Sequence, residues 1–511
     1  MTKTAKTISA RSFLDRRVRA SIENNIYRGA RQSPTAVVMD RRTRRAALLA
    51  ALLATVCCDA QLADLLGLGN VARDLTGALA DHPLVKASSS ITGDIVSSVS
   101  DVFSVPILQI ARALGVDGSI PVLLDDNLVA HGDFISAEYM GGLGNEDVNL
   151  PLSGLIVKYG FPLERYQVHT ADGYILSVFR IPRATPAPVV FLMHGLLASA
   201  DDWVLTGRSS ALAYRLADAG YDVWLGNARG NKHSRKHETL SPETASFWDF
   251  SWHEIGVHDL PAMIDLALNV SGARALKYVG HSQGTTAFFV MASLRPEYND
   301  KVSLMVALSP VAWMTRTVSP PVRLLAPGQK WLHTFFAAFG LHEFLPDNGI
   351  MRVLRTLMCG TNTLAELLCG NALFLVAGFN LDQLNVTNLP VVFGHEPSGA
   401  STKQLVHYAQ GVLSREFCQF DYGQQENLRR YGRAQPPAYP IERVSTPVSL
   451  VYSTADWLAH PDDVDELYAR LGNVVDIHRV PHDKFNHLDF ILAKDVNVLI
   501  NDRLINFFSH F

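Results

Sequence analysis

The sequence of 511 residues has no run of eighteen or more consecutive apolar residues, about the length that a helix needs to cross a bilayer. No permanent membrane span is therefore expected. Charged residues are also scarce, at 18% with a formal net charge of -4, so the sequence indicates neither disorder, nor a nucleic-acid partner, nor steering toward anionic membranes. The 48% of hydrophobic residues suffice for a large core with an inserted subdomain.

Cysteine is rare, with five in the chain. Cys57 and Cys58 lie in the apolar N-terminal run over residues 46–58 and would be removed with it. Cys359 and Cys369 lie close together and could form a disulfide in an oxidising compartment, which leaves Cys418 as a free thiol. The sequons at Asn269 and Asn385 permit glycosylation. No metal-ligand cluster or phosphate-binding loop is evident in the sequence, so no cofactor is implied.

The N-terminal region contains the pattern of an export signal. Four arginines within residues 41–45 precede an apolar run over 46–58, and small residues follow up to Ala60. A basic segment, a short apolar segment and a small-residue cleavage site are typical of a secretory signal peptide. The alternative, an amphipathic helix of the mature protein, is disfavoured because the run is apolar on every face.

The position of this signal is unusual, since the basic segment normally stands at the very N-terminus. We therefore expect that Met39 is the working initiator, or that residues 1–38 are an extension introduced by the gene model, with 39–60 as the signal peptide. Residues 61–144 lack clear motifs and are interpreted as a propeptide or accessory extension. An uncleaved signal anchor is the rival, although the apolar run is short for a span of about twenty residues. A secreted or lysosomal protein is expected.

From about Asn145 the hydrophobic pattern predicts a sheet. Residues 166–169 and 174–178 alternate as strands around a turn at 172–173. Short apolar runs separated by helical stretches follow, as in the buried parallel strands of α/β proteins; they cover 188–193, 222–225, 277–279, 302–308, 448–452 and 474–480. Two antiparallel strands before parallel ones indicate the α/β-hydrolase fold, a mostly parallel central sheet with helices on both faces.

The alternation stops between residues 310 and 447, which separate the two parts of the predicted core, 145–309 and 448–511. This stretch is helix-prone and rich in large apolar side chains, among them Trp331, Phe335, Phe336 and Phe339. One interpretation is an ordinary helical subdomain with its own core, and the other is a cap that covers the active site. Both are kept because a cap also needs a core, and 310–447 is predicted to be a cap with a lid.

A pentapeptide at residues 280–284, GHSQG, matches the G-x-S-x-G pattern. Its context adds more than the pattern, since an apolar strand at 277–279 precedes it and a helical stretch at 285–289 follows. In such a strand-to-helix turn the serine backbone is strained, and side chains at the flanking glycine positions would clash. Ser282 is therefore the predicted nucleophile.

A serine hydroxyl is a poor nucleophile until a base takes its proton. In this fold the acid follows a later strand and the histidine lies near the C-terminus. Asp456 comes just after the strand predicted at 448–452, and His487 lies where a loop meets the final helix. His482 also follows the last strand but is the weaker candidate by position. We predict that His487 is the base and that Asp456 fixes its tautomer.

An oxyanion hole completes the predicted site. The strand at 188–193 is followed by the loop HGLL at 194–197. In this fold one backbone N–H comes from that loop and another from the residue after the nucleophile. We assign them to Leu196 and Gln283; one such donor typically contributes about 2.7–4 kcal/mol to transition-state stability.

Together these segments strongly resemble the acid lipase family of gastric and lysosomal lipases. The matching stretches are colinear and lie at 194–199, 222–231, 280–286, 371–374 and 485–491, within a similarity that covers roughly 145 to 511. The resemblance implies a neutral-lipid esterase with a cap that includes a mobile lid. It carries the family's triad onto Ser282, Asp456 and His487 and its oxyanion pair onto Leu196 and Gln283, in agreement with the fold argument.

The sequence departs from this family before about Asn145, where the family has no counterpart. Cys359 and Cys369 resemble the family's cap disulfide with a spacing one residue longer, and Ala377 stands where the family has a further cysteine. These departures concern the geometry of the cap and leave the chemistry unchanged.

Three functions fit the sequence to different degrees, and none of them implies an oligomeric state. The first is a lipase that acts on triacylglycerols or cholesteryl esters at a lipid–water interface, which the long apolar cap favours. The second is an esterase or acyltransferase that uses another hydrophobic acyl donor. The third is a catalytically inactive lipid-binding or carrier protein, against which the complete triad and oxyanion segments argue.

Overall fold

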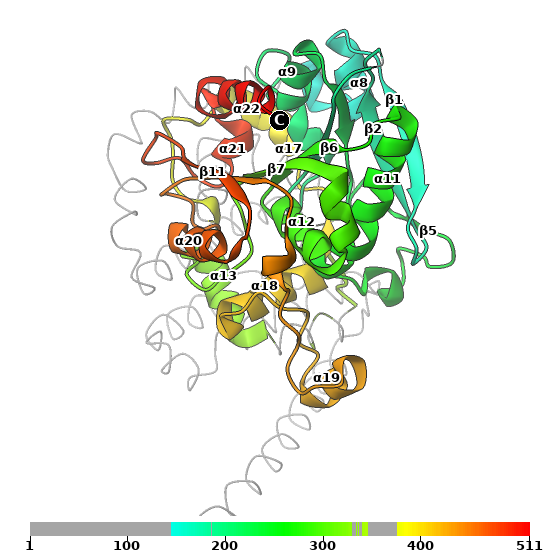
Figure 1. Cartoon of the computed structure of the whole chain (residues 1–511), viewed down its shortest axis with the longest axis vertical. Helices are drawn as coiled ribbons and strands as arrows, with labels where there is room; N and C mark the ends of the chain where they lie inside the picture. Colours follow the sequence, from blue (N-terminus) through cyan, green and yellow to red (C-terminus); the bar gives the residue numbers. More distant parts are fainter. Residues whose placement is uncertain (1–144, 185, 330–333, 335, 337–339, 346–375) are drawn as a thin grey trace, which may run out of the picture. The chain divides into compact units, whose positions relative to one another are not determined.

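The computed structural model describes residues 145–511 except 185, 330–333, 335, 337–339 and 346–375 (Figure 1). The predicted extension 1–38, the signal peptide 39–60 and the segment 61–144 lie outside the described residues. So do Cys359, Cys369 and three of the four aromatic residues named for the predicted cap, Trp331, Phe335 and Phe339.

A nine-stranded sheet forms the centre of the described chain, in the order β1-β2-β4-β3-β6-β7-β10-β11, with β5 paired to β2 beside this path. The strands are β1 (Glu164–His169), β2 (Tyr174–Ile181), β3 (Val189–Met193), β4 (Asp222–Leu225), β5 (Lys236–His237), β6 (Leu276–His281), β7 (Val302–Leu308), β10 (Val448–Tyr452) and β11 (Val474–Arg479). β2 is antiparallel to β1, β4 and β5, and the remaining pairs are parallel. The α/β-hydrolase prediction is confirmed; only β5, two residues long, left no hydrophobic pattern to predict it.

The central strands divide their side chains between two apolar cores. In β3, Phe191 faces one core and Leu192 the other, and in β6, Tyr278 and Val279 divide in the same way. Every residue of β3, β4 and β6 is buried, because helices cover both faces of a sheet of this kind. The edge strands β1 and β11 instead alternate between half-buried and exposed residues.

Helices from before and after the insertion between β7 and β10 cover the two faces (Figure 1). Side chains of α11, α12 and α20 contribute to the first core, and those of α8, α9 and α22 to the second. Their bounds are α8 (Leu152–Lys158), α9 (Leu212–Asp218), α11 (Leu260–Ser271), α12 (Gln283–Leu294), α20 (Pro461–Arg470) and α22 (Asp502–Phe508). The short helices α10 (Trp252–Glu254) and α21 (Asp489–Leu492) precede α11 and α22.

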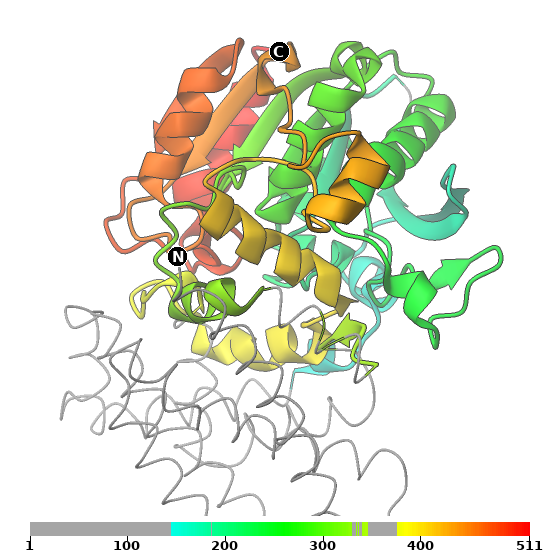
Figure 2. The ribbon, with the colours of Figure 1, turned by 90° about the horizontal axis from the view of Figure 1, so that it is seen from below.

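Between β7 and β10 the chain leaves the sheet, where the cap is predicted. The described elements of this insertion are α13 (Pro320–Leu325), β8 (Glu343–Phe344), α17 (Leu389–His395), β9 (Ala400–Ser401), α18 (Thr402–Ser414) and α19 (Gln424–Tyr431). β8 and β9 pair as a separate two-stranded sheet. Figure 2 shows α13, α17 and α18 together on one side of the central sheet.

A sharp turn joins β6 to α12. Its central residue, Ser282, has φ 51° and ψ -117°, a conformation that costs a non-glycine residue free energy. A Cβ on Gly284 would lie 2.3 Å from the Met193 carbonyl oxygen, and one on Gly280 would lie 2.8 Å from the backbone of Gly284. Both glycines are therefore required for the helix to start this close to the end of β3.

Replacement of Gly284 by alanine tests this steric constraint. The added Cβ would overlap the carbonyl oxygen of Met193 at the end of β3. We therefore expect a loss of about 2 kcal/mol or more in the free energy of unfolding. Chemical denaturation measures the loss. Gly328→Ala is the control, because a Cβ at Gly328 meets no atom within 4 Å; equal stability of the two variants would contradict the constraint.

Candidate active site

Ser282, Asp456 and His487 meet beyond the carboxyl ends of β6, β10 and β11. The His487 Nε2 lies 2.7 Å from the Ser282 Oγ, and its Nδ1 lies 3.0 Å from both carboxylate oxygens of Asp456. Asp456 and His487 are both buried. The structure thus brings the three predicted residues into one hydrogen-bonded chain.

The Asp456 side chain is held in its charged form. Burial alone would raise the pKa of Asp456, but the His487 charge and hydrogen bonds from His487, Ser309 and the Ala459 N–H outweigh burial and lower the pKa. An ionised Asp456 favours the His487 tautomer that carries its proton on Nδ1. Nε2 is then the proton acceptor that faces the serine hydroxyl.

Ser309 is a polar residue of the site that the sequence analysis missed. It follows β7, which lies between β6 and β10 in the sheet. Its Oγ lies 2.5 Å from Asp456 Oδ2 and 2.7 Å from His487 Nδ1. The one available signal was its position, directly after a predicted parallel strand.

The chain returning from the cap region connects the loops that carry the acid and the base. The Ala377 carbonyl accepts the N–H groups of Trp457 and His487, both at 3.3 Å. Gly378 has φ +113°, and a Cβ there would lie 2.4 Å from the Ala455 carbonyl oxygen. Only glycine fits this passage, so this segment of the insertion between β7 and β10 is part of the framework around His487.

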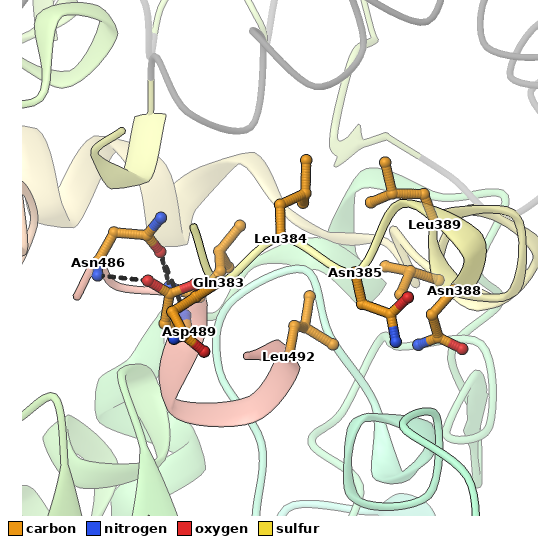
Figure 3. A pocket seen from close by; sticks show the side chains of 10 residues that line it. Gln383, Leu384, Asn385, Asn388, Leu389, Asn486, Asp489 and Leu492 are labelled. Carbon is orange, nitrogen blue, oxygen red and sulfur yellow. Dashed lines mark hydrogen bonds between the residues drawn. The ribbon is translucent and has the colours of Figure 1, made fainter. Parts of the chain in front are cut away.

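A pocket adjoins the loop of His487 (Figure 3). Polar and apolar side chains line it together: Gln383, Leu384, Asn385, Asn388, Leu389, Val392, Asn486, Leu488, Asp489 and Leu492. The Asp489 carboxyl accepts the Asn486 N–H at 2.8 Å, and burial raises the pKa of Asp489 to about 7. Neither Ser282 nor His487 lines this pocket, so it is separate from the Ser282 hydroxyl.

Gly195, which directly precedes Leu196, and Gln283 lie beside Ser282. Gln283 is the first residue of α12, and a Cβ on Gly195 would approach the Ser282 Cβ to 3.2 Å. The loop after β3 therefore runs against the serine, the arrangement that two converging N–H donors need. The Gln283 side chain donates from Nε2 to Oε1 of Gln404 in α18 at 2.7 Å, which connects this residue to the insertion between β7 and β10.

The other predicted positions lie apart from this cluster. Asn269 and Asn385 are exposed, His482 accepts the backbone N–H of Lys484 at 3.3 Å, and Cys418 is a free thiol whose pKa burial raises to about 11. In the part of the chain that the structure describes, none of the helices combines the length and the apolar character that crossing a membrane requires.

The loop of Leu196 leads into a buried cluster of charged side chains that the sequence analysis missed. The Asp201 carboxylate lies 2.7 Å from Lys232 Nζ, 2.6 Å from His233 Nε2 and 2.7 Å from His395 Nδ1. Although burial alone would raise the pKa of Asp201, these partners hold it well below its usual value. The histidines come from positions 32 and 194 residues away along the chain, so no local motif marks the cluster.

Glu396 adds a further carboxyl to this cluster, beside that of Asp202, and links the cluster to the loop after β3. Its Oε1 accepts the Ser199 hydroxyl at 2.7 Å, and Ser398 donates its N–H to the Leu197 carbonyl at 2.6 Å. Burial, reinforced by the Asp201 charge, raises the pKa of Glu396 to about 7. Glu396 is therefore protonated in acid and becomes a further negative charge of the cluster as the pH rises through 7.

This raised pKa predicts a pH-dependent stability. A carboxyl whose pKa is higher in the folded than in the unfolded protein stabilises the fold below the unfolded pKa, and this contribution is lost as the pH rises through the folded value. We therefore expect Glu396→Gln, which imitates the neutral form, to reduce the drop in Tm between pH 5 and pH 8. Thermal unfolding at pH 5 and at pH 8 measures this drop in Tm for each protein. The exposed Glu442 supplies the control Glu442→Gln; identical drops in the two variants would refute the prediction.

Known proteins resemble this chain over the described region. Residues 152–207 match a family described as a partial alpha/beta-hydrolase lipase region, and residues 188–489 match the alpha/beta hydrolase fold. Lipase 1 of Drosophila melanogaster is 43% identical over 70% of this chain and 80% of its own length. The Homo sapiens lysosomal acid lipase/cholesteryl ester hydrolase is 40% identical over 70% and 91%, and the Rattus norvegicus gastric triacylglycerol lipase 39% over 71% and 93%. The chain therefore belongs to the acid lipase family of α/β hydrolases and is an ester hydrolase of the lipase class.

Proposed function

We propose that this hydrolase acts on neutral lipids, either triacylglycerols or cholesteryl esters, through an acyl-enzyme formed on Ser282. The observation that carries the proposal is the 2.7 Å contact between Ser282 Oγ and His487 Nε2, with the Asp456 carboxylate on the far side of the imidazole. The names of the gastric triacylglycerol lipase and of the lysosomal acid lipase/cholesteryl ester hydrolase support this substrate class.

In the first half-reaction His487 Nε2 takes the proton from Ser282 Oγ while this oxygen attacks the ester carbonyl carbon. The carbonyl electrons move to the oxygen, and the N–H groups of Leu196 and Gln283 stabilise the oxyanion. The C–O bond to the alcohol then breaks, and His487 gives its proton to the leaving oxygen. Asp456 stabilises the imidazolium in between.

In the second half-reaction a water molecule gives its proton to His487 Nε2 and attacks the acyl carbonyl carbon. The second tetrahedral intermediate uses the same two N–H donors. Its collapse breaks the bond to Ser282 Oγ, which takes the proton back from His487. The products are a carboxylic acid and an alcohol, and the only co-reactant is water.

We propose further that residues 310–447 form a cap whose lid covers Ser282, and that Cys359 and Cys369 form a disulfide in it. The insertion lies between β7 and β10, and these two strands precede Ser309 and Asp456 of the proposed site. It contacts Gln283 through Gln404. A lipid surface would stabilise an open lid, since it removes apolar area from water.

We also propose that the protein enters the secretory pathway. Residues 39–60 would act as a signal peptide, residues 1–38 as a non-mature extension, and residues 61–144 as a propeptide or accessory segment, in a secreted or lysosomal protein. The names of the lysosomal and gastric relatives support this location. The exposed side chains of Asn269 and Asn385 are accessible for glycosylation.

Ser282→Ala tests the nucleophile. Because triad members act as a unit, we expect kcat for a triacylglycerol to fall about 10⁵-fold or more while the circular dichroism spectrum is unchanged. A serine-directed phosphonate should label the parent protein at Ser282. Ser293→Ala is the matched control on the same helix, since that hydroxyl donates only to the Val290 carbonyl. A folded Ser282→Ala variant with near-parental turnover would disprove the mechanism.

The proposed lid predicts that the rate of hydrolysis depends on the presence of a lipid surface. Opening exposes apolar area, which water penalises at about 25 cal/mol per Å², and an interface removes this penalty. The rate on a short-chain triacylglycerol should therefore rise sharply once its concentration exceeds the solubility limit. A water-soluble ester serves as the control and should give ordinary saturation. A smooth saturation curve for the triacylglycerol across its solubility limit would count against a lid.

A further inference from the structure

Ser309 contacts both Asp456 and His487 at the point where these two side chains meet. Its side chain is fully buried, with Oγ 2.5 Å from Asp456 Oδ2 and 2.7 Å from His487 Nδ1. An ionised carboxylate only accepts hydrogen bonds, so the single hydroxyl proton of Ser309 goes to Asp456. A lone pair of Oγ then faces His487 Nδ1, which must carry a proton to be accommodated there.

The backbone of Ser309 is held without help from its hydroxyl. Its N–H donates to the Val451 carbonyl at 2.9 Å, and the preceding Leu308 carbonyl accepts the Ser282 N–H at 3.1 Å. These bonds fix the residue between the nucleophile turn and the strand of the acid. The hydroxyl is therefore not needed for strand pairing, and its two short contacts are both with the Asp456–His487 pair.

The backbone conformation at Ser309 is also costly. Its φ of 53° lies in the left-handed region, where any side chain with a Cβ is disfavoured relative to glycine. Strained non-glycine residues of this kind concentrate at functional sites, where the surrounding structure maintains them. Glycine would relieve the strain but would lack the hydroxyl.

We propose that Ser309 is a positioning residue that holds the Asp456 carboxylate and the Nδ1–H tautomer of His487 in register, so that Nε2 faces Ser282. This inference rests on the proposed roles of the triad. The hydroxyl shares the negative charge of Asp456 in the resting enzyme. When His487 takes the Ser282 proton, the Nδ1–H of the imidazolium has both Asp456 and Ser309 as acceptors. Ser309 acts through the pair and does not touch the substrate.

The test compares Ser309→Ala and Ser309→Gly, which both remove the hydroxyl but differ in backbone strain. Hydrogen bonds to charged groups are the strong ones, so kcat should fall about 10-fold in each variant, with KM changed less than about twofold. Glycine tolerates the positive φ, so the two variants should differ in Tm although they lose the same activity. The matched control is Ser453→Ala, because Ser453 Oγ is buried and has no hydrogen-bond partner among the described residues.

The pH profile supplies a readout that a structural role would not move. Loss of Ser309 has two opposing effects on the imidazolium: it removes a neutral acceptor of the Nδ1–H, and it leaves the Asp456 charge unshared. The carboxylate charge is the stronger of the two, because it acts on the imidazolium charge directly, so the acid limb of kcat/KM should move to higher pH. Among the described residues, His281 and Asp489 also interact electrostatically with Asp456, and both variants leave these two groups in place.

Three outcomes would overturn the inference. The first is a parental kcat in Ser309→Ala, and the second is an acid limb of kcat/KM that does not move. The third is a parental kcat in Ser309→Gly, which would show that activity follows stability and not the hydroxyl. Ser282→Ala is assayed in the same series. If that variant is inactive while Ser309→Ala is unaffected, only the role of Ser309 fails. If Ser282→Ala remains active, the proposed mechanism fails as well.

Discussion

The close packing of α12 against the end of β3 is the contact on which the site depends. A Cβ at Gly284 would lie 2.3 Å from the Met193 carbonyl oxygen, so the helix can approach only because this residue is glycine. The approach forces Ser282 into its strained turn and places it against Gly195. The proposed nucleophile and both proposed oxyanion donors are therefore positioned by one backbone contact.

The parallel sheet then determines which residues can reach Ser282. β6, β7 and β10 are neighbours in the sheet, and parallel strands present their carboxyl ends at the same edge. The backbone continues this connection, since Leu308 accepts the Ser282 N–H and Ser309 donates to Val451. A displacement of β7 would therefore move the nucleophile turn and the acid together, which preserves their relative geometry.

Sequence alone predicted the parts of the site that follow strands, because buried strands are apolar runs that end at turns. Ser282 and Asp456 stand directly after such runs, and the structure has β6 and β10 where they were predicted. Ser309 also stands after one, but nothing local distinguishes a serine that contacts an acid from one that does not. The Asp201 cluster depends on partners 32 and 194 residues away, and a single sequence contains no signal for such pairings.

The insertion between β7 and β10 also supplies bonds that the sheet cannot. Ala377 accepts the N–H of His487, Ser398 donates to the Leu197 carbonyl, and Gln404 accepts from the side chain of Gln283. Each bond reaches a residue of the proposed site or its direct neighbour, so the loops of His487 and Leu197 are held by the insertion between β7 and β10 as well as by the core. A lid movement that kept this geometry would have to leave these three anchoring residues in place.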